Sequence, residues 1–187
     1  MVRSRAAILR AAADLLIESG ASGVTIEGIA ERSGVAKTTI YRHWKSRSQL
    51  VFDAFGSLFP KVAVTVFEGP VRERLTTLLS QLTLGVTVSE WAPAIPALVD
   101  ASARDAELRK LIKDFLAARM EHGREVLRAA VARGELRRDL DVDAGINLLV
   151  APIFYRRLVS FDVLDESFVA RIVHEFLRGA EPSRQRD

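Results

Sequence analysis

Apolar residues return at spacings of three and four along most of the chain, and this periodicity constrains the fold more than any other feature. Residues 4–19 show it clearly, because Ile8, Leu15 and Leu16 fall on one side of a helix. No alternation of apolar and polar residues lasts long enough to indicate a β-strand. The sequence therefore predicts an all-α protein with about nine helices.

Capping residues and helix breakers supply the predicted boundaries. Gly20 is placed to end the first helix, Thr25 to cap a short second one, and Ser46 with Gln49 to open a fourth. The two prolines of WAPAIP, residues 91–96, are interpreted as a break. The other predicted helices are 37–45, 71–88, 104–133 with a possible interruption at Gly123, one that begins at Asp141 or Asp143 with a possible kink at Pro152, and 166–178.

Positive charge is concentrated at the N-terminus. Residues 1–50 contain eight Lys and Arg against four Asp and Glu, whereas the rest contains 19 against 20. A basic lobe on a nearly neutral body indicates a polyanionic partner, although a solvated basic face has the same composition. We expect a first domain at 1–50, a second, helical domain at 51–180, and a disordered tail at 181–187.

Several classes of function find no support in the residues. The chain has no cysteine, so disulfides and thiolate zinc sites are excluded. His122 and His174 stand apart from other histidines, and no nucleophile with a base, carboxylate pair or phosphate-binding glycine loop is recognisable. We therefore expect no enzyme, no cofactor and no metal. Arg10, Asp14 and Glu18 interrupt the first apolar segment, which indicates an amphipathic helix rather than a secretory signal, and the expected location is the cytoplasm.

The stretch GVAKTTIYRHWKSRSQL, residues 34–50, has the pattern of a helix-turn-helix. Two short helices meet at Gly34, and the second is polar and basic except for Ile40 and Trp44, which are four residues apart and share one face. In a helix-turn-helix the second helix enters the major groove of DNA. The N-terminal domain is therefore predicted to be a three-helix DNA-binding unit. A protein-interaction adaptor, whose basic helix binds an acidic partner, is the alternative.

The segment GVTIEGIAERSGVAKTTIYRHWKSRSQLVFDAF, residues 23–55, closely resembles the DNA-binding domain of tetracycline-repressor-type (TetR/AcrR) regulators. The resemblance implies a one-component transcriptional regulator, most often a repressor, that binds a palindromic operator as a homodimer. It also implies release by a small-molecule effector. In this interpretation residues 1–50 are the DNA-binding domain and residues 51–180 are an effector-binding and dimerisation domain, whose last two helices form a four-helix bundle with those of the partner. The effector itself is unknown.

The same resemblance implies individual contacts with double-stranded DNA. Those expected at bases are Lys37, Thr38, Thr39 and His43, and those expected at phosphates are Thr25, Tyr41 and Lys45, with Arg42 and Arg47 as additions. An alternative role for His43 is to stack or pack at the end of the helix instead of contacting a base. Two positions depart from the family pattern. Ala36 stands where a Ser or Thr often caps the recognition helix, and Glu27 stands where some members have a basic residue, although its carboxylate can accept a hydrogen bond from cytosine.

The C-terminal body offers fewer distinctive residues. Aromatic and sulfur-containing side chains near the proline-broken segment are candidates for an effector pocket, with ordinary core packing as the alternative: Trp91, Phe115, Met120 and Phe154. Two apolar stripes near the C-terminus predict a dimer interface formed by Ile146, Leu149, Val150, Ile153, Phe168, Ile172 and Phe176. Arg156 and Arg157 fit an anionic effector, a helix cap or the rim of the dimer equally well.

Overall fold

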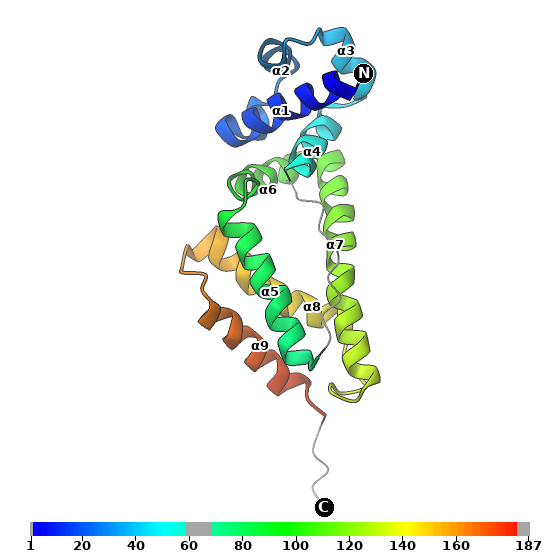
Figure 1. Ribbon diagram of the computed structural model, residues 1–187, viewed down its shortest axis with the longest axis vertical. Coiled ribbons are helices and arrows are strands. Elements are labelled where there is room, and N and C mark those ends of the chain that lie inside the picture. Colours follow the sequence, from blue (N-terminus) through cyan, green and yellow to red (C-terminus); the bar gives the residue numbers. More distant parts are fainter. Residues whose placement is uncertain (1, 59–68, 183–187) are drawn as a thin grey trace, which may run out of the picture. The chain divides into compact units, whose positions relative to one another are not determined.

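The computed structural model describes residues 2–58 and 69–182, with side chains from residue 4 onward. Within these residues the chain forms nine α-helices, one 3-10 turn and one π-helical turn, without a strand (Figure 1). The predicted all-α fold with about nine helices is therefore confirmed. Most of the tail predicted to be disordered, residues 183–187, lies outside the described residues.

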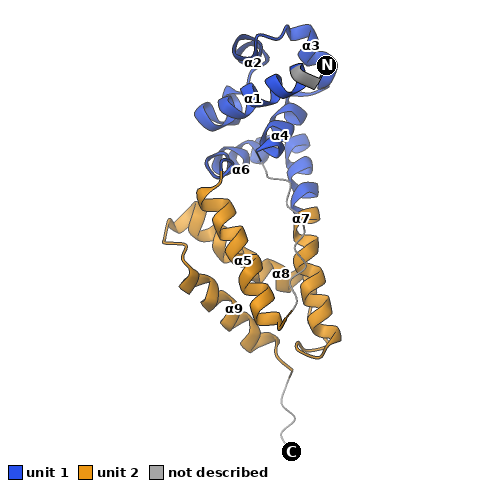
Figure 2. Ribbon diagram, viewed as in Figure 1, with its two compact units in different colours: residues 1–62, 90–116 blue, residues 63–89, 117–187 orange. Residues whose placement is uncertain are grey.

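The chain divides into two compact units, which Figure 2 shows in different colours. One comprises residues 1–62 with 90–116, and the other comprises residues 63–89 with 117–187. The first unit therefore contains the basic N-terminal helices together with a segment from the middle of the chain. The boundary between residues 116 and 117 falls within one continuous helix, α7 (Ala106–Ala132).

The first unit is built around its N-terminal helix. Its α1 packs against α2, α4 and α6, and buries Ile8, Ala12 and Leu16. The removal of these side chains from water is the main stabilising contribution. Besides the first part of α7, the elements of this unit are α1 (Val2–Gly23), α2 (Ile26–Ser33), α3 (Lys37–His43), α4 (Arg47–Ser57), the 3-10 turn η1 (Ala92–Ala94) and α6 (Ile95–Arg104).

The predicted caps of the N-terminal helices are present. Thr25 Oγ1 accepts a hydrogen bond of 3.0 Å from the backbone N–H of Gly28, and Ser46 Oγ accepts one of 3.1 Å from Gln49. Gly34 ends α2 with φ of 67°, a left-handed conformation that glycine adopts without steric cost. Gly20 has φ of 68° and ψ of −177°, so the predicted helix end at this residue is a kink, after which one more turn follows.

The segment predicted as a break and one long helix contains an additional helix. Residues 95–104 form α6, and Asp105 separates it from α7. Pro96 lies in the first turn of α6, where a proline has no intrahelical N–H bond to lose. A proline in this position begins a helix rather than breaking one, which is why the prediction missed α6, whereas the predicted helix 104–133 corresponds to α7. The possible interruption at Gly123 is absent, since α7 continues through it.

The second unit contains α5 (Val71–Val88), the later part of α7, α8 (Val142–Tyr155), the π-helical turn η2 (Arg156–Ser160) and α9 (Glu166–Ala180). Helices α5, α8 and α9 pack against one another around Leu75, Leu79 and Leu149. Gly123 allows α7 to approach α8 closely, because a Cβ atom at this position would lie 2.5 Å from Ile146 Cδ1. The core of this unit is therefore formed by residues far apart in the sequence.

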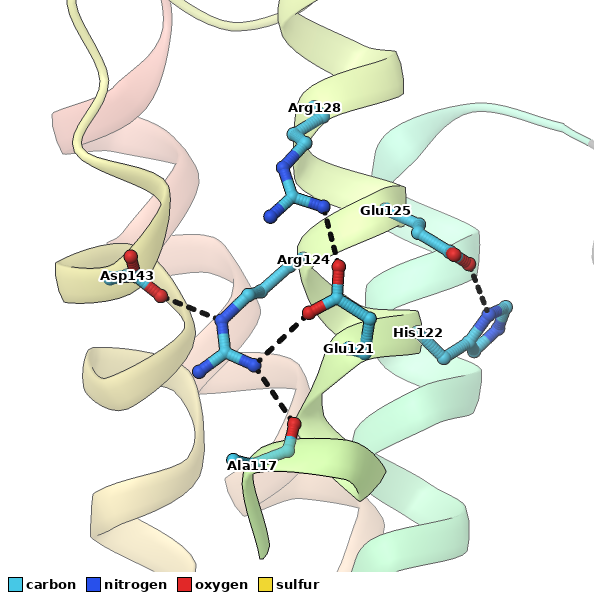
Figure 3. A network of polar contacts seen from close by, with 7 residues as sticks. All are labelled: Ala117, Glu121, His122, Arg124, Glu125, Arg128 and Asp143. Carbon is cyan, nitrogen blue, oxygen red and sulfur yellow. Dashed lines mark hydrogen bonds and ion pairs between the residues drawn. The ribbon is translucent and has the colours of Figure 1, made fainter. Parts of the chain in front are cut away.

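A network of polar contacts joins α7 to the start of α8 (Figure 3). Arg124 donates from Nε to Asp143 Oδ1 over 2.6 Å and from Nη1 to the carbonyl oxygen of Ala117 over 3.0 Å. Asp143 is thereby used in an ion pair between helices, and Asp141 is the residue that caps α8, accepting a hydrogen bond from Ala144. Of the two predicted caps, Asp141 is confirmed.

Five of the seven residues predicted for the dimer interface are buried within the single chain. Ile146, Leu149, Val150, Ile153 and Ile172 are at most 9% exposed within a single chain. They are buried because the inner stripe of α8 and the apolar stripe of α9 pack on α5 and on each other. Phe168 and Phe176 are half-buried, the first beneath the guanidinium of Arg156 and the second beside Gly145. The five buried side chains stabilise their own unit, and the part that any of the seven takes in a dimer stays a prediction.

Candidate nucleic-acid interface

The second helix of the helix-turn-helix, α3, is anchored by two side chains. Ile40 is fully buried and Trp44 is 3% exposed. The indole Nε1 of Trp44 donates to Asp53 Oδ2 over 2.9 Å, and Arg5 donates to the same oxygen over 3.0 Å. Burial on one face and a hydrogen bond at the end fix the rotation of this short helix. The opposite face of α3 therefore points outward.

The outward face of α3 carries most of the side chains expected to contact DNA. Thr38, Tyr41, Arg42 and Lys45 are exposed, and Tyr41 is 62% exposed, a high value for an aromatic ring. Thr39 is half-buried. Hydroxyl, ammonium and guanidinium groups on one convex surface can donate to phosphate oxygens and to the edges of bases. The structure thus places Thr38, Tyr41 and Arg42 on one short helix and Lys45 two residues after its end.

Thr25 is placed at the start of α2, where its hydroxyl oxygen accepts from Gly28. The residue is exposed. Its O–H remains a donor, so the same group can cap the helix and bind a phosphate oxygen. The two functions are compatible in geometry.

His43 has a different environment from its neighbours on α3. Its ring lies 5.5 Å from the ring of Trp44 and its Nε2 is buried without a hydrogen-bond partner. A ring packed at the helix end has less freedom to reach a base than the exposed residues of the helix. This position favours the packing alternative for His43.

Arg47 is used within the protein. Its Nε donates to the carbonyl oxygen of Val24 over 2.9 Å, and its Nη2 donates to that of Ala21. These carbonyls lie at and just beyond the end of α1, where backbone oxygens lack partners within the helix. Arg47 thus binds carbonyls at the end of α1, and its contact with DNA stays a prediction.

Lys37, the first residue of α3, forms an ion pair with Glu27 in the first turn of α2. Lys37 Nζ lies 2.5 Å from Glu27 Oε1, and both side chains are exposed. The hydrogen bond from Lys37 lowers the pKa of Glu27. Glu27, which departs from the family pattern, therefore has an ion-pair partner within the helix-turn-helix. The spacing of the two residues in the sequence did not indicate this ion pair.

The start of α4 is tied to the junction of α6 and α7. Ser48 Oγ donates to Asp105 Oδ2 over 2.5 Å, and Ser46 Oγ donates to Glu107 Oε1 over 2.7 Å. Asp105 also caps α7, since its Oδ1 accepts from the backbone N–H of Leu108. A hollow of about 550 Å³ adjoins these groups and is lined by Gly20, Ala21, Ser22, Arg47, Ser48, Val51, Ala97, Asp100, Ala101, Arg104, Asp105 and Leu108. An aspartate before a helical segment is a typical N-cap, so Asp105 could have been recognised from the sequence as the start of α7.

We expect Asp105→Ala to lower the free energy of unfolding by about 1–3 kcal/mol, because it removes a helix cap and leaves the buried Ser48 hydroxyl without its acceptor. The backbone N–H of Leu108, followed by the Ser48 hydroxyl, lowers the pKa of Asp105. A carboxylate with a lowered folded pKa stabilises the protein above its unfolded pKa of about 4 and loses this effect as the pH falls. The difference from wild type should therefore shrink in acid. Urea unfolding at several pH values measures it, with exposed Asp100→Ala as a control expected within about 0.5 kcal/mol.

The four residues predicted for an effector pocket fall in both units. Trp91 and Phe115 belong to the first unit, where each meets Phe55 of α4 edge to face, at centroid distances of 6.2 and 6.1 Å. Met120 and Phe154 belong to the second unit and are half-buried. The contacts of Trp91 and Phe115 give α4 a second connection to the middle of the chain. Their role towards an effector stays a prediction.

Arg156 and Arg157 both donate to backbone oxygens of their own unit. Arg156 Nη1 donates to the carbonyl of Val163 over 2.5 Å, and Arg157 Nε donates to that of Val86 over 2.7 Å. Both line a hollow of about 330 Å³. The two arginines thus contribute to the local structure of the turn after α8.

No single helix among the described residues is long and apolar enough to cross a membrane, and only α5 taken together with residues 92–104, as a bent pair, meets that test of length and composition.

Comparisons with known proteins agree with the geometry. The family of bacterial regulatory proteins of the tetR type matches residues 8–54, and the tetracyclin repressor-like C-terminal domain matches residues 68–176. The HTH-type transcriptional regulator YdeS of Bacillus subtilis is 32% identical over 176 residues, which are 94% of this chain and 88% of YdeS. The DNA-binding transcriptional repressor TetR of Mycobacteroides abscessus is 28% identical over 92% of this chain and 90% of its own length.

A solved structure shows the same architecture. The TetR family transcription regulator SCO0332 has a TM-score of 0.69 and 31% identity, over 96% of this chain and 99% of its own. The matching domains together span both the helix-turn-helix and the C-terminal helices. The chain therefore belongs to the tetracycline-repressor family, and it is a DNA-binding transcriptional regulator rather than an enzyme.

Proposed function

We propose that the protein is a homodimeric repressor that binds a palindromic operator and leaves it when a small molecule binds. The observation that carries this proposal is the fixed orientation of α3, in which buried Ile40 and Trp44 turn Tyr41 and Lys45 outward. A repressor role has a precedent in the relative from Mycobacteroides abscessus, which is named as one. The adaptor alternative assigns the same surface to an acidic protein.

The proposed contacts divide into two kinds. Lys37, Thr38 and Thr39, on the first turn of α3, read base edges in the major groove, where a lysine donates to the O6 and N7 atoms of guanine. Tyr41, Lys45 and Thr25 bind phosphates and set the position of the helix, with Arg42 as an exposed addition. His43 supports the end of the helix.

The proposed dimer uses the outward face of α8. Leu148 and Tyr155 are 66% and 58% exposed, and exposed Ala144 and Ala151 lie on the same stripe, which continues to Val159 at 60%. A helix that is apolar on two opposite faces is typically packed against other protein on both of them. The exposed face of α9 beside it is mostly polar and charged. A two-fold axis would place the two recognition helices about 34–36 Å apart, which matches one turn of DNA and requires inverted half-sites.

Release by an effector requires a path from the C-terminal helices to the DNA-binding helices. Residues 91–115 contact α4 at both ends, through Asp105 and Glu107 at its start and through Trp91 and Phe115 near Phe55. A ligand that shifts α6 or the start of α7 would thus move α4. Two regulators that share this fold are solved with small molecules, one with stearoyl-CoA and one with choline, which are precedents for a ligand response without indicating the ligand here.

Selection of bound sequences from random duplex DNA tests the proposal. We expect an inverted repeat with wild-type protein. Tyr41→Ala should weaken binding to all selected sequences by roughly tenfold, because it removes a phosphate contact, whereas Lys37→Ala should change the base preferred at one position of each half-site.

The two variants act as controls for each other, since both residues are exposed and lie on the same helix. An enriched sequence without two-fold symmetry would contradict the dimer on DNA. Equal binding of selected and scrambled DNA at every salt concentration would contradict operator recognition and support the adaptor alternative.

A further inference from the structure

The ion pair between Glu27 and Lys37 spans the two helices of the helix-turn-helix. Its atoms are 2.5 Å apart, and the Glu27 and Lys37 side chains are 69% and 50% exposed. Lys37 is the first residue of α3, at the end of the helix that reaches the bases. In the protein without DNA, the charged end of a base-reading lysine is therefore occupied by a carboxylate of its own chain.

DNA competes with Glu27 for the ammonium group of Lys37. A lysine that donates to a phosphate or to guanine gives up at least part of its contact with Glu27. The carboxylate then faces the phosphate backbone, where like charges repel. Its unfavourable contribution is removed only if another donor replaces the lysine.

Bases can supply such a donor, and phosphates cannot. The amino groups N4 of cytosine and N6 of adenine lie in the major groove and donate hydrogen bonds, whereas phosphate oxygens only accept them. A sequence that places one of these amino groups near Glu27 satisfies the carboxylate. A sequence that does not leaves it without a partner.

We propose that Glu27 is a specificity-determining residue that holds Lys37 away from non-operator DNA and is released without penalty only where the operator presents a base amino group. This inference rests on the proposed function, because it assumes that α3 reads an operator. It assigns to a carboxylate at the DNA surface the role of weakening binding to the wrong sequences. Specificity of this kind comes from unfavourable contacts with competitors as much as from favourable contacts with the target.

The first unit contains a matched pair of the same chemistry. Glu18 on α1 and Arg32 on α2 form an ion pair of 2.7 Å, with side chains 54% and 37% exposed. Neither residue is among the proposed DNA contacts. Glu18→Gln therefore removes the same charge and a comparable cross-helix ion pair, which makes it a control for effects of net charge and of local stability.

The experiment compares Glu27→Gln and Glu18→Gln by fluorescence anisotropy on the selected operator and on a scrambled duplex, over a series of salt concentrations. We expect Glu27→Gln to bind scrambled DNA about three- to tenfold more tightly at low salt. The slope of the logarithm of the binding constant against the logarithm of the salt concentration should steepen by about the amount expected for one additional phosphate contact. Its affinity for the operator should rise less or fall, so that the specificity ratio decreases. Glu18→Gln should stay within about twofold of wild type on both duplexes.

A second background tests whether Glu27 acts through Lys37. In Lys37→Met, the further change Glu27→Gln should have a clearly smaller effect on scrambled DNA than it has in wild type, because the competing ammonium group is absent. An undiminished effect in Lys37→Met would overturn the role assigned to the pair. Equal changes on the two duplexes, or changes equal to those of Glu18→Gln, would overturn specificity. If wild-type protein itself fails to distinguish operator from scrambled DNA, the proposed function is wrong, an outcome that the wild-type titration reveals independently of the variants.

Discussion

Leu148→Glu is expected to convert the protein from a dimer to a monomer, with an increase of at least about 100-fold in the dimer dissociation constant. Leu148 is 66% exposed on the outward stripe of α8, between Ala144 and Ala151. In a two-fold interface each substitution is present twice, so two carboxylates would be buried in an apolar surface without partners. Light scattering at micromolar concentration measures the mass directly.

The same variant should keep its fold, because an exposed side chain contributes little to the stability of the single chain. Its affinity for a full operator should fall towards that for a half-site. Leu84 on α5 is 58% exposed and lies outside the stripe, so Leu84→Glu is the matched control and should remain dimeric. A wild-type monomer at these concentrations, or a dimeric Leu148→Glu, would show that α8 does not form the interface.

Trp44→Ala should lower the free energy of unfolding by about 3–5 kcal/mol and remove binding to DNA. The side chain is 3% exposed, donates to Asp53, and lies with its ring 5.4 Å from the guanidinium of Arg5. Its removal leaves a cavity at the C-terminal end of α3 and deletes the side-chain hydrogen bond from this end to Asp53 of α4. Without this anchor, α3 loses its fixed rotation and no longer presents its outward face as a unit.

Tyr41→Ala is the comparison that separates stability from DNA binding. Tyr41 lies three residues earlier on the same helix but is 62% exposed, so its removal should change the free energy of unfolding by no more than about 0.5 kcal/mol. Urea unfolding followed by circular dichroism measures both variants. An unchanged unfolding midpoint for Trp44→Ala would contradict the anchoring role, and a large shift for Tyr41→Ala would show that this ring is structural.

The helix-turn-helix was predictable from the sequence because the signals that define it are local. Thr25 reaches a backbone N–H three residues away, Ser46 does the same, and Gly34 adopts the left-handed conformation at its own position. Ile40 and Trp44 share a face through helical geometry alone. Each of these features depends on neighbouring residues and could therefore be recognised without the fold.

The contacts that the sequence did not indicate are those between residues far apart in the chain. Arg47 has the charge and position of a phosphate contact, but the end of α1 folds back to place two carbonyls beside it. Ser48 meets Asp105, 57 residues further along, and periodicity carries no information on such a pair. The apolar residues of α8 were recognised as stripe-forming, whereas the burial of the inner stripe within the same chain was not predicted.

The sequence by itself determined that the chain is helical and where most helices begin and end, because caps, breakers and helical periodicity act over a few residues. The resemblance of residues 23–55 to a known family indicated the DNA-binding unit. The tertiary structure decided which polar groups have partners within the chain and which apolar stripe of α8 stays exposed. Both depend on contacts with other parts of the chain. Arg47 donates to a carbonyl at the end of α1, Glu27 forms an ion pair with Lys37, and α5 and α9 bury the inner face of α8. Burial and pairing between distant segments set these outcomes, because they decide which side chains are exposed and which polar groups already have a partner in the same chain.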